Sequence, residues 1–401
     1  MNDFSIRYKL EQHTPMIHFQ AKQSGATLRA TELKPKLDKF LLKKKIEKLP
    51  MREHPNGDRS LPYKVTITAT EVESKLINTP NQKGKYDPFP AYFANLGEKD
   101  PSNHKLFSMA KNIEITFFSL YPEVIDAIRT YFAEFLLKHN FGTRQTKGFG
   151  SFYIDPADNN YVKPETLYKG VYHFNTPYKD AKNLFEDVDL FYRSLRSGIN
   201  MKNSSGTVYY FKSAMFLFTK NVLNAVWDKR AIKQKFLNPS KLSEQIADHN
   251  GADILTDTPS KDRPAYLMRD LLGLSTQQSW MSEKFTLTKE HSEISRMKSP
   301  ILFKPLKTDK GFRVHLVLYA MPEKIFNEEF SITTDKSREK LLLPTPPTTL
   351  RDKIKTGAFV QYAINTIDVD KHVSSDYHQY VYHDKLKRIY SDLKRSLGGK
   401  K

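Results

Sequence analysis

Residues Asn140–Phe152 read NFGTRQTKGFGSF, and this stretch decides how the rest of the chain is interpreted. It lies between an amphipathic helical pattern and a short apolar run. Glycine lets a backbone approach a ligand closely and adopt positive φ, and exposed N–H groups beside Arg144 and Lys147 would suit a phosphate or an RNA backbone. A plain helix C-cap followed by a strand, with its charges in solvent, is the alternative. The stretch alone leaves both interpretations open.

Composition points to a polyanionic partner. The 401 residues carry a formal charge of +19, well beyond what solubility requires. The 26 Phe and 21 Tyr offer rings that can stack on bases, although most such rings belong to a core. The chain has no cysteine, which excludes disulfides, thiolate metal sites and thiol nucleophiles. With no signal peptide at MNDFSIRYKL and no apolar run long enough to span a bilayer, we expect a cytoplasmic protein without a membrane partner.

The first part of the chain has the pattern of an α+β domain. Apolar residues recur at helical spacing within Gly25–Leu49 and again after Pro122, where Ile125, Ile128 and Phe132 share one face. Alternation predicts the strands Ser5–Leu10, Met16–Phe19, Tyr63–Ala69, Asn112–Leu120 and Phe152–Ile154. The succession of strands, helix, Gly-rich turn and strand favours a ferredoxin-like sandwich.

The remainder reads as a helical middle followed by a second α+β unit. Tyr161–Asn250 is predicted to be helical and basic, with Asp187–Gly198 and Asn221–Phe236 its clearest helices. Further on, we predict strands at Ile301–Pro305 and Phe312–Ala320, and helices at Thr349–Ile364 and Lys385–Leu397. Two stretches rich in turn-forming residues, Asn78–His104 and Asn250–Lys261, are expected to be loops. The predicted domains are 1–160, 161–284 and 285–401.

Four segments carry a resemblance to the RAMP superfamily of CRISPR-associated RNA-binding proteins, and within it to the family of the first subunit of the Cmr module. They are HTPMIHF (13–19), GATLRATELKPKLDKFL (25–41), FGTRQTKGFGSF (141–152) and SPILFKPLK (299–307). Lys34 is followed by Pro35, where the family usually has a Lys-Gly pair.

The resemblance implies both a fold and a function. The fold would be α+β, with two ferredoxin-like (RRM-like) domains separated by a helical insertion. The protein would be a non-catalytic RNA-binding subunit of a type III-B CRISPR effector, active in antiviral defence. It would bind the guide (crRNA) and target RNA beside other RAMP subunits near the guide's 3′ end, and it would need no cofactor.

The candidate RNA-binding residues are mostly cations and glycines. Arg144 and Lys147 would contact phosphates, while the loop glycines would let the RNA backbone come close. Lys304 lies in an apolar run, so its charge is expected to face solvent or a ligand. Phe149 would stack on a base or belong to the core. The full set is Arg29, Lys34, Lys36, Lys39, Gly142, Arg144, Lys147, Gly148, Phe149, Gly150 and Lys304. A solvated helix face is the alternative for the four residues 29–39.

Other chemistries have weaker signals. The alternative function is a metal-independent endoribonuclease that processes CRISPR RNA, in which His13 or His18 would act in cleavage. In the structural alternative, His13 satisfies hydrogen bonds of a turn and His18 points from a strand. Asp368 and Asp370 would share one face of a strand, yet no further ligand lies near them in sequence, so we expect no metal. No helix-turn-helix or zinc pattern favours a DNA-binding protein. The C-terminal cations Lys385, Lys387, Arg388, Lys394 and Arg395 would contact RNA or a neighbouring subunit, or form a solvated helix face.

Overall fold

The protein is described by a computed structural model, and its chain divides into two compact units. Unit 1 comprises Met1–Val188 and Phe303–Val317, and unit 2 comprises Asp189–Leu302 and Leu318–Gly399. The structure describes residues 4–18, 27–77, 89–91, 100, 104–168, 171–202, 208–237, 263–280, 284–372 and 381–398. Each unit is presented by itself.

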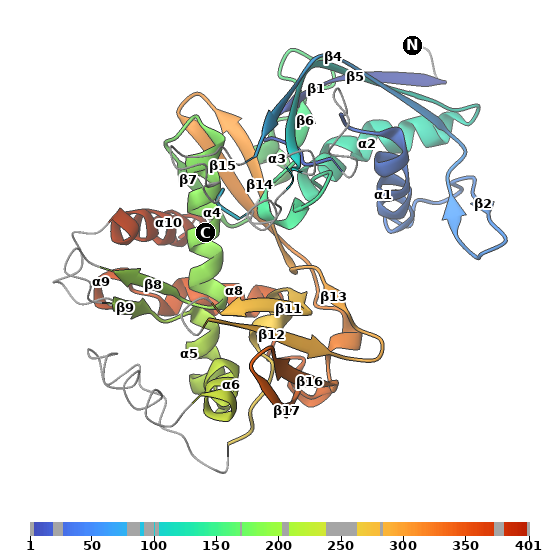
Figure 1. Cartoon of the computed structure of the whole chain (residues 1–401). Helices are drawn as coiled ribbons and strands as arrows, with labels where there is room; N and C mark the ends of the chain where they lie inside the picture. The colour runs from blue at the N-terminus through green and yellow to red at the C-terminus, as the bar shows by residue number, and fades with distance from the viewer. Residues whose placement is uncertain are drawn as a thin grey trace. The chain divides into compact units, whose positions relative to one another are not determined.

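Unit 1 is built on a four-stranded antiparallel sheet with the order β4-β5-β1-β6 (Figure 1). Its elements follow the chain as β1 (Ser5–Gln12), α1 (Ala30–Leu42), β4 (Lys64–Leu76), β5 (Leu106–Phe118), α2 (Pro122–Lys138) and β6 (Phe152–Ile154). A small hairpin, β2 (Arg52–Glu53) and β3 (Arg59–Ser60), lies between α1 and β4. The succession β1-α1-β4-β5-α2-β6 follows the βαββαβ element order.

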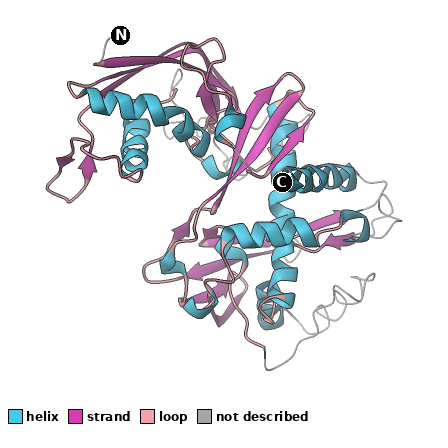
Figure 2. Ribbon diagram, turned by 180° about the vertical axis from the view of Figure 1, so that it is seen from behind, coloured by secondary structure: helices cyan, strands magenta, loops and turns pink. Residues whose placement is uncertain are grey.

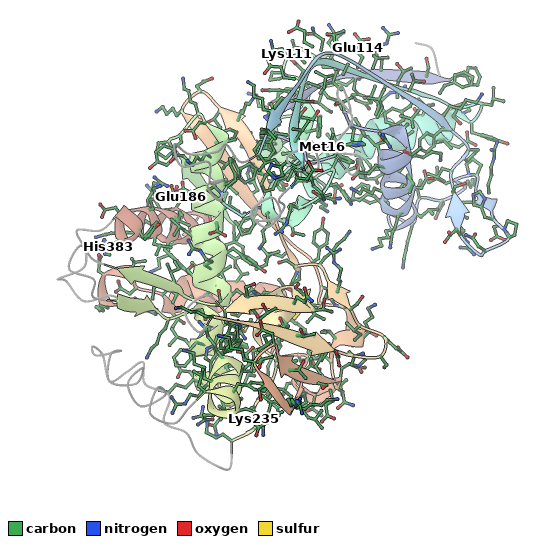
Figure 3. All side chains as sticks on the ribbon, viewed as in Figure 1. Met16, Lys111, Glu114, Glu186, Lys235 and His383 are labelled. Atoms are coloured by element: carbon green, nitrogen blue, oxygen red, sulfur yellow. The ribbon has the colours of Figure 1, made fainter. Side chains whose placement is uncertain are left out.

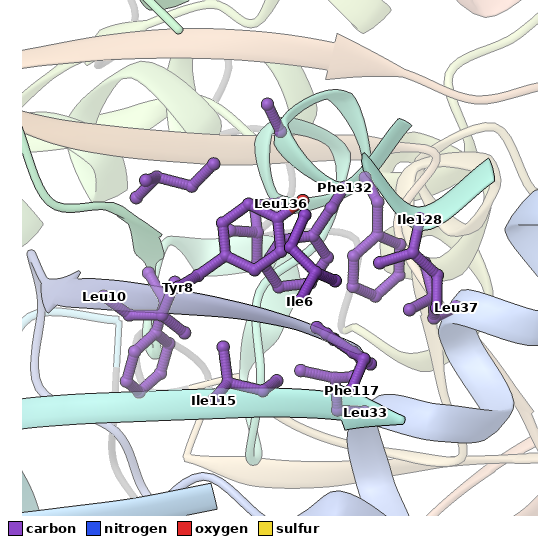
Figure 4. Packing of buried hydrophobic residues seen from close by; sticks show 14 of the residues in the cluster. Ile6, Tyr8, Leu10, Leu33, Leu37, Ile115, Phe117, Ile128, Phe132 and Leu136 are labelled. Carbon is purple, nitrogen blue, oxygen red and sulfur yellow. The ribbon is translucent and has the colours of Figure 1, made fainter. Parts of the chain in front are cut away.

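The core of unit 1 lies between this sheet and the helices α1 and α2, which cover one face (Figures 1 and 2). Alternation along β1 turns Ile6, Tyr8 and Leu10 inward. They pack with apolar residues of the two helices, such as Leu37 and Phe132 (Figure 4). The opposite face of β1, β4 and β5 bears polar residues.

A second sheet in unit 1 has the order β14-β15-β7. Its strands are β7 (His173–Thr176), β14 (Ile301–Thr308) and β15 (Gly311–Leu318), and the short helix α3 (Pro164–Leu167) precedes β7. β7 therefore pairs with a strand far along the chain and runs antiparallel to it, with Thr176 opposite Phe312 and His173 opposite His315. The chain passes between the units within α4 (Ala181–Arg196), within β14 and at the end of β15.

Unit 2 combines an antiparallel sheet of order β11-β12-β16-β17 with several helices. Its strands are β8 (Ile199–Lys202), β9 (Val208–Phe211), β10 (Leu274–Ser275), β11 (Gln277–Trp280), β12 (Phe285–Glu290), β13 (Arg296–Met297), β16 (Glu329–Thr334) and β17 (Ser337–Pro344). Its helices are α5 (Ala214–Asn221), α6 (Asp228–Phe236), α8 (Thr356–Thr366), α9 (Val369–His372) and α10 (Val381–Gly398), with 3-10 turns η4 (Arg269–Leu272), η5 (Glu323–Ile325) and η6 (Thr348–Leu350).

The α+β class is confirmed, but two ferredoxin-like domains are not. Within the described part of 285–401, β12 pairs with β16 and β16 with β17, and no α-helix lies between β12 and β16 in the chain, so the βαββαβ order of unit 1 is not repeated. The units also divide the chain differently from the predicted ranges 1–160, 161–284 and 285–401, because β14 and β15 pair with β7. The helical middle was wrong in part, since β7, β8 and β9 lie within it.

Two predicted loops fall mainly outside the described residues: most of Asn78–His104 and all of Asn250–Lys261. Of the predicted strand Met16–Phe19, Phe19 lies outside the described residues, and Met16 forms an isolated bridge with Ser108. Across the part of the chain that is described, no helix is both long enough and apolar enough to cross a membrane.

Candidate nucleic-acid interface

The Gly-rich stretch forms a compact loop between α2 and β6. The 3-10 turn η2 (Gln145–Lys147) lies at its centre, and Arg144 and Gly148 flank this turn in the left-handed region, at φ 56° and 92°. Gly142 and Gly150 also have positive φ. Gly142, Gly148 and Gly150 therefore adopt left-handed backbone, which glycine does without the strain that a Cβ atom brings.

The glycines make room for the protein's own backbone. A Cβ atom on Gly150 would lie 2.0 Å from the carbonyl oxygen of Phe141, and one on Gly142 would lie 2.6 Å from that of Ile17. Gly148 packs against Pro305, whose Cγ would be 3.0 Å from such an atom. The expected reason for these glycines, close approach of an RNA backbone, is therefore replaced by close approach within the fold.

Several N–H groups of the loop donate hydrogen bonds within unit 1. Gly142 N donates to both carboxylate oxygens of Glu32, at 2.9 and 3.2 Å. Gly150 N donates to the carbonyl of Pro15, and Ser151 N donates to Thr14 Oγ1, each at 2.9 Å. The expectation that these N–H groups are open to a phosphate was wrong, because neighbouring segments accept their hydrogen bonds.

One side of α1 supports the loop. Lys36 Nζ lies 2.7 Å from Glu32 Oε1 and donates to the carbonyl of Asn140 and to Gln145 Oε1, each at 3.1 Å. Arg29 and Lys39 follow the same helical spacing as Glu32 and Lys36, so they lie on this side of the helix. Lys39 is exposed and Arg29 half-buried. Of the predicted cations of α1, Lys36 therefore holds the loop in place, whereas Lys39 points into solvent.

Lys34 lies on another side of α1. Its Nζ donates to Asp38 Oδ2 and to the carbonyl of Leu61, both at 2.8 Å, and lies 3.9 Å from the ring centroid of Tyr63. The structure does not bring Lys34 to the loop, and the side chain links α1 to the start of β4.

Lys304 supports the loop from β14. Its ammonium group is fully buried and donates to the carbonyls of His139 and Phe152, at 3.0 and 2.9 Å. These carbonyls stand at the two ends of the Gly-rich stretch. Burial holds the pKa of Lys304 well below its usual range. The expectation that this charge faces solvent or a ligand was wrong, because β14 is buried from Ile301 to Leu306.

Two further loop residues point inward. The ring of Phe149 is fully buried and stacks on Phe185 at 3.8 Å between centroids, so it belongs to the core and is not a stacking platform for bases. Lys147 is half-buried with a buried Nζ. Arg144 is the loop cation whose side chain is exposed.

The four segments that carry the family resemblance meet at this loop. Thr14 and Pro15 come from the first, Glu32 and Lys36 from the second, and Phe303–Lys307 from the fourth. Asn140 Nδ2 donates to the carbonyl of Phe303 at 2.8 Å, and Ser151 Oγ donates to that of Pro305 at 2.7 Å. The arrangement fixes the loop from three sides, and Arg144 remains exposed.

The histidines proposed for catalysis are buried. His13 is 6% exposed, and its Nδ1 accepts a hydrogen bond from the backbone N–H of Lys307 at 3.0 Å. Burial, then the charges of Lys304 and Lys307, hold the pKa of His13 well below its usual range. His18 is 3% exposed. These positions fit structural roles, as the alternative for His13 stated.

Sequence reasoning missed several residues that shape the site. Glu32 is the main acceptor for the loop, and its i,i+4 spacing to Lys36 was the available signal. Lys307 is exposed, whereas Lys304 of the same strand is buried. It lines a cleft of about 410 Å³ beside the β14–β15 hairpin, with Lys179, Thr308, Asp309, Gly311 and Phe312.

The remaining candidates lie in unit 2. Asp370 belongs to helix α9, not to a strand, and its carboxylate contacts Lys387 Nζ at 2.9 Å and His383 Nε2 at 3.0 Å. Among the described residues, no group of three His, Asp or Glu side chains is placed to hold a metal ion. On α10, Lys394 donates to the carbonyl of Ile367, Arg395 pairs with Asp392, and Lys385 is buried. Arg388 lies on the same helix.

Comparison with known proteins gives a consistent assignment. The model of the Cmr1 N-terminal domain matches residues 3–199, and that of the Cmr1 C-terminal domain matches residues 210–387. No curated protein matches the chain. Among solved structures, Cmr1 from Pyrococcus furiosus in its apo form is similar at 11% identity and a TM-score of 0.39, covering 81% of this chain and 91% of that one. Because the two domain models match in order and together span most of the sequence, the chain belongs to the Cmr1 family of CRISPR RAMP proteins.

Proposed function

We propose that this protein is a non-catalytic RNA-binding subunit of a type III-B Cmr complex. Family membership implies a Cmr complex subunit. In this role the protein would bind the guide RNA, and target RNA paired with it, beside other RAMP subunits in antiviral defence. Binding would use backbone charge and shape, and specificity would come from pairing between guide and target.

The observation that carries the proposal is the position of Arg144. Its side chain is exposed, with Nη1 3.4 Å from the carbonyl oxygen of Ala91, on a loop that α1, β14 and residues 13–17 hold in place. A cation on a rigid support contacts a phosphate without the entropy cost of ordering the loop. Lys39 on α1 adds a second exposed charge on the side of the helix that faces the loop. The net charge of +19 favours the same class of partner.

Burial of His13 and His18 supports the non-catalytic part. A general acid or base must come within hydrogen-bond reach of the substrate, and both rings are enclosed by the fold. Burial also holds the pKa of His13 well below its usual range, which disfavours this ring as a general acid. The endoribonuclease alternative therefore has less support than a binding role.

The test is incubation of the purified protein with labelled repeat-containing RNA, with and without a chelator. We expect a shifted complex on a native gel and unchanged RNA on a denaturing gel. A discrete new RNA product would contradict the non-catalytic role, and its loss in His13→Ala would restore the endoribonuclease. Absence of any complex at low salt would contradict RNA binding itself.

A further inference from the structure

The outer face of the unit 1 sheet, opposite α1 and α2, presents an ordered grid of side chains. Registers along β4, β5 and β1 define three outward rows: Lys64–Phe118–Ser5, Thr66–Thr116–Arg7 and Thr68–Glu114–Lys9. The rows between them, such as Val65–Phe117–Ile6, point into the core. Glu114, together with Lys111, lies on the side of the sheet away from the helices (Figure 3). We call these three rows the outer grid.

An aromatic ring stands in the outer grid where the pattern calls for a polar residue. Phe118 lies on the central strand β5 and is 44% exposed. Its ring stands among the charges and hydroxyls of the three rows, so it is the ring of the outer grid that can stack on a base.

The charges and hydroxyls of the outer grid suit a nucleic acid. The grid holds three cations and one carboxylate, and four of its remaining members are Ser or Thr hydroxyls. Arg7 stays mostly exposed, with its Nη1 3.8 Å from Glu114 Oε2. A protein interface of ordinary kind would bury a mainly apolar centre, whereas Phe118 is the one apolar side chain in the three rows. Cations around a stacking ring are the combination that binds single strands.

We propose that the outer grid binds single-stranded RNA, with Phe118 stacked on a base and with Arg7, Lys9 and Lys64 close to phosphates. Adjacent strands are about 4.8 Å apart and alternate rows about 7 Å apart, so neighbouring nucleotides meet different rows. The inference rests on the proposed function, since it assumes that the protein binds RNA. It adds a second contact region, formed by β1, β4 and β5, to the loop that carries Arg144.

The test is fluorescence anisotropy with a labelled, unstructured oligouridine, at several salt concentrations. Phe118→Ala removes the ring, and we expect the affinity to fall about fivefold or more. Phe118→Tyr keeps a ring and should restore the affinity to that of the unaltered protein. Arg7→Gln should reduce the salt dependence by about 0.7 in the slope of log K against log salt. Leu342→Ala is the matched control, because it removes another exposed apolar side chain, 57% exposed and in unit 2.

The outcomes separate the two proposals. Affinities of Phe118→Ala and Arg7→Gln equal to that of the control, with melting temperatures unchanged, overturn the outer grid as an RNA site and leave the loop proposal standing. Loss of binding in Phe118→Ala without rescue by Phe118→Tyr overturns base stacking. A protein that binds no oligouridine and no repeat RNA contradicts the proposed function first.

Discussion

Two buried lysines show how differently the two units accommodate charge. Lys304 in unit 1 is fully buried, and the groups that accept its hydrogen bonds are the carbonyls of His139 and Phe152. Lys289 in unit 2 is 1% exposed and lies 2.6 Å from Asp270 Oδ2, beside Arg196, Arg269 and Asp228. In unit 2, a buried carboxylate compensates the charge of the buried lysine, whereas in unit 1 backbone carbonyls accept the hydrogen bonds of the buried lysine.

The two lysines hold different parts of the molecule together. Burial alone would raise the pKa of Asp270, but Lys289 and Arg196 outweigh it and hold that pKa below its usual range. The pair therefore links β12 to η4 and stabilises unit 2. Lys304 instead joins the two ends of the Gly-rich loop, and so it acts on the candidate interface. The comparison predicts that changes in unit 2 affect stability alone, while changes around Lys304 also affect RNA binding.

The largest effect is expected from Lys289→Met. The change leaves Asp270 buried with less cationic compensation, which should lower the free energy of unfolding by about 3–5 kcal/mol. Denaturant unfolding measures this loss, and hydrogen–deuterium exchange should place it in unit 2. An unfolding free energy equal to that of the unaltered protein would show that the charge balance described for unit 2 is wrong.

Gly150→Ala should have the next largest effect. The new Cβ would lie 2.0 Å from Phe141 O at a φ of +66°, which combines left-handed strain with overpacking. We expect a loss of about 2–4 kcal/mol in the free energy of unfolding. Gly57→Ala is the matched control, since Gly57 has φ +79° with no atom within 4 Å of such a Cβ. Equal losses in the two variants would mean that close packing does not hold the loop.

Lys304→Met should lower the free energy of unfolding less than Gly150→Ala does, and it should also weaken RNA binding. It leaves the carbonyls of His139 and Phe152 without this donor, at about 1–3 kcal/mol in the free energy of unfolding. Because both ends of the loop loosen, RNA affinity measured by anisotropy should also fall. Lys289→Met, measured at a temperature where it stays folded, should keep its affinity. An unchanged affinity in Lys304→Met would break the proposed link between this lysine and the interface.

The smallest effect concerns His315, which stacks on Tyr168 in unit 1. Burial, followed by the charges of His173, Arg313 and Lys304, holds the pKa of His315 well below its usual range. Below about pH 6.5 the unfolded chain binds a proton at this histidine and the folded chain does not, so stability falls as pH falls, by about 1.4 kcal/mol per pH unit. His315→Phe should flatten this part of the stability curve between pH 7 and 5. A curve as steep as that of the unaltered protein would contradict the assignment.

Strands and helices of unit 1 were largely predictable, because their apolar periodicity reflects a single covered face. The predicted strand Ser5–Leu10 matches β1, and the helix from Pro122 matches α2. Pairing of β14 and β15 with β7 was not predictable, since it joins segments that no local pattern connects. The domain boundaries were not predictable either, because this long-range pairing places Phe303–Val317 in unit 1.

The position of the Gly-rich loop between α2 and β6 was predicted, but the reason for its glycines was not. The glycine content identified the loop. The sequence does not distinguish a glycine that lets RNA approach from one, such as Gly150, that lets the carbonyl oxygen of Phe141 approach. Lys304 and Phe149 failed as surface residues because local sequence does not show that β14 and Phe185 cover them. Glu32 was not predicted, because a carboxylate is not expected beside a site that binds an anion.

We propose that the Gly-rich loop presents Arg144 to an RNA backbone. The most direct test compares the salt dependence of RNA binding for Arg144→Ala with that for Arg59→Ala, a control arginine that is also exposed, in the β2–β3 hairpin. We predict that Arg144→Ala binds more weakly and lowers the slope of log K against log salt by about 0.7, while Arg59→Ala leaves both unchanged. Equal slopes and affinities for the two variants would contradict the account.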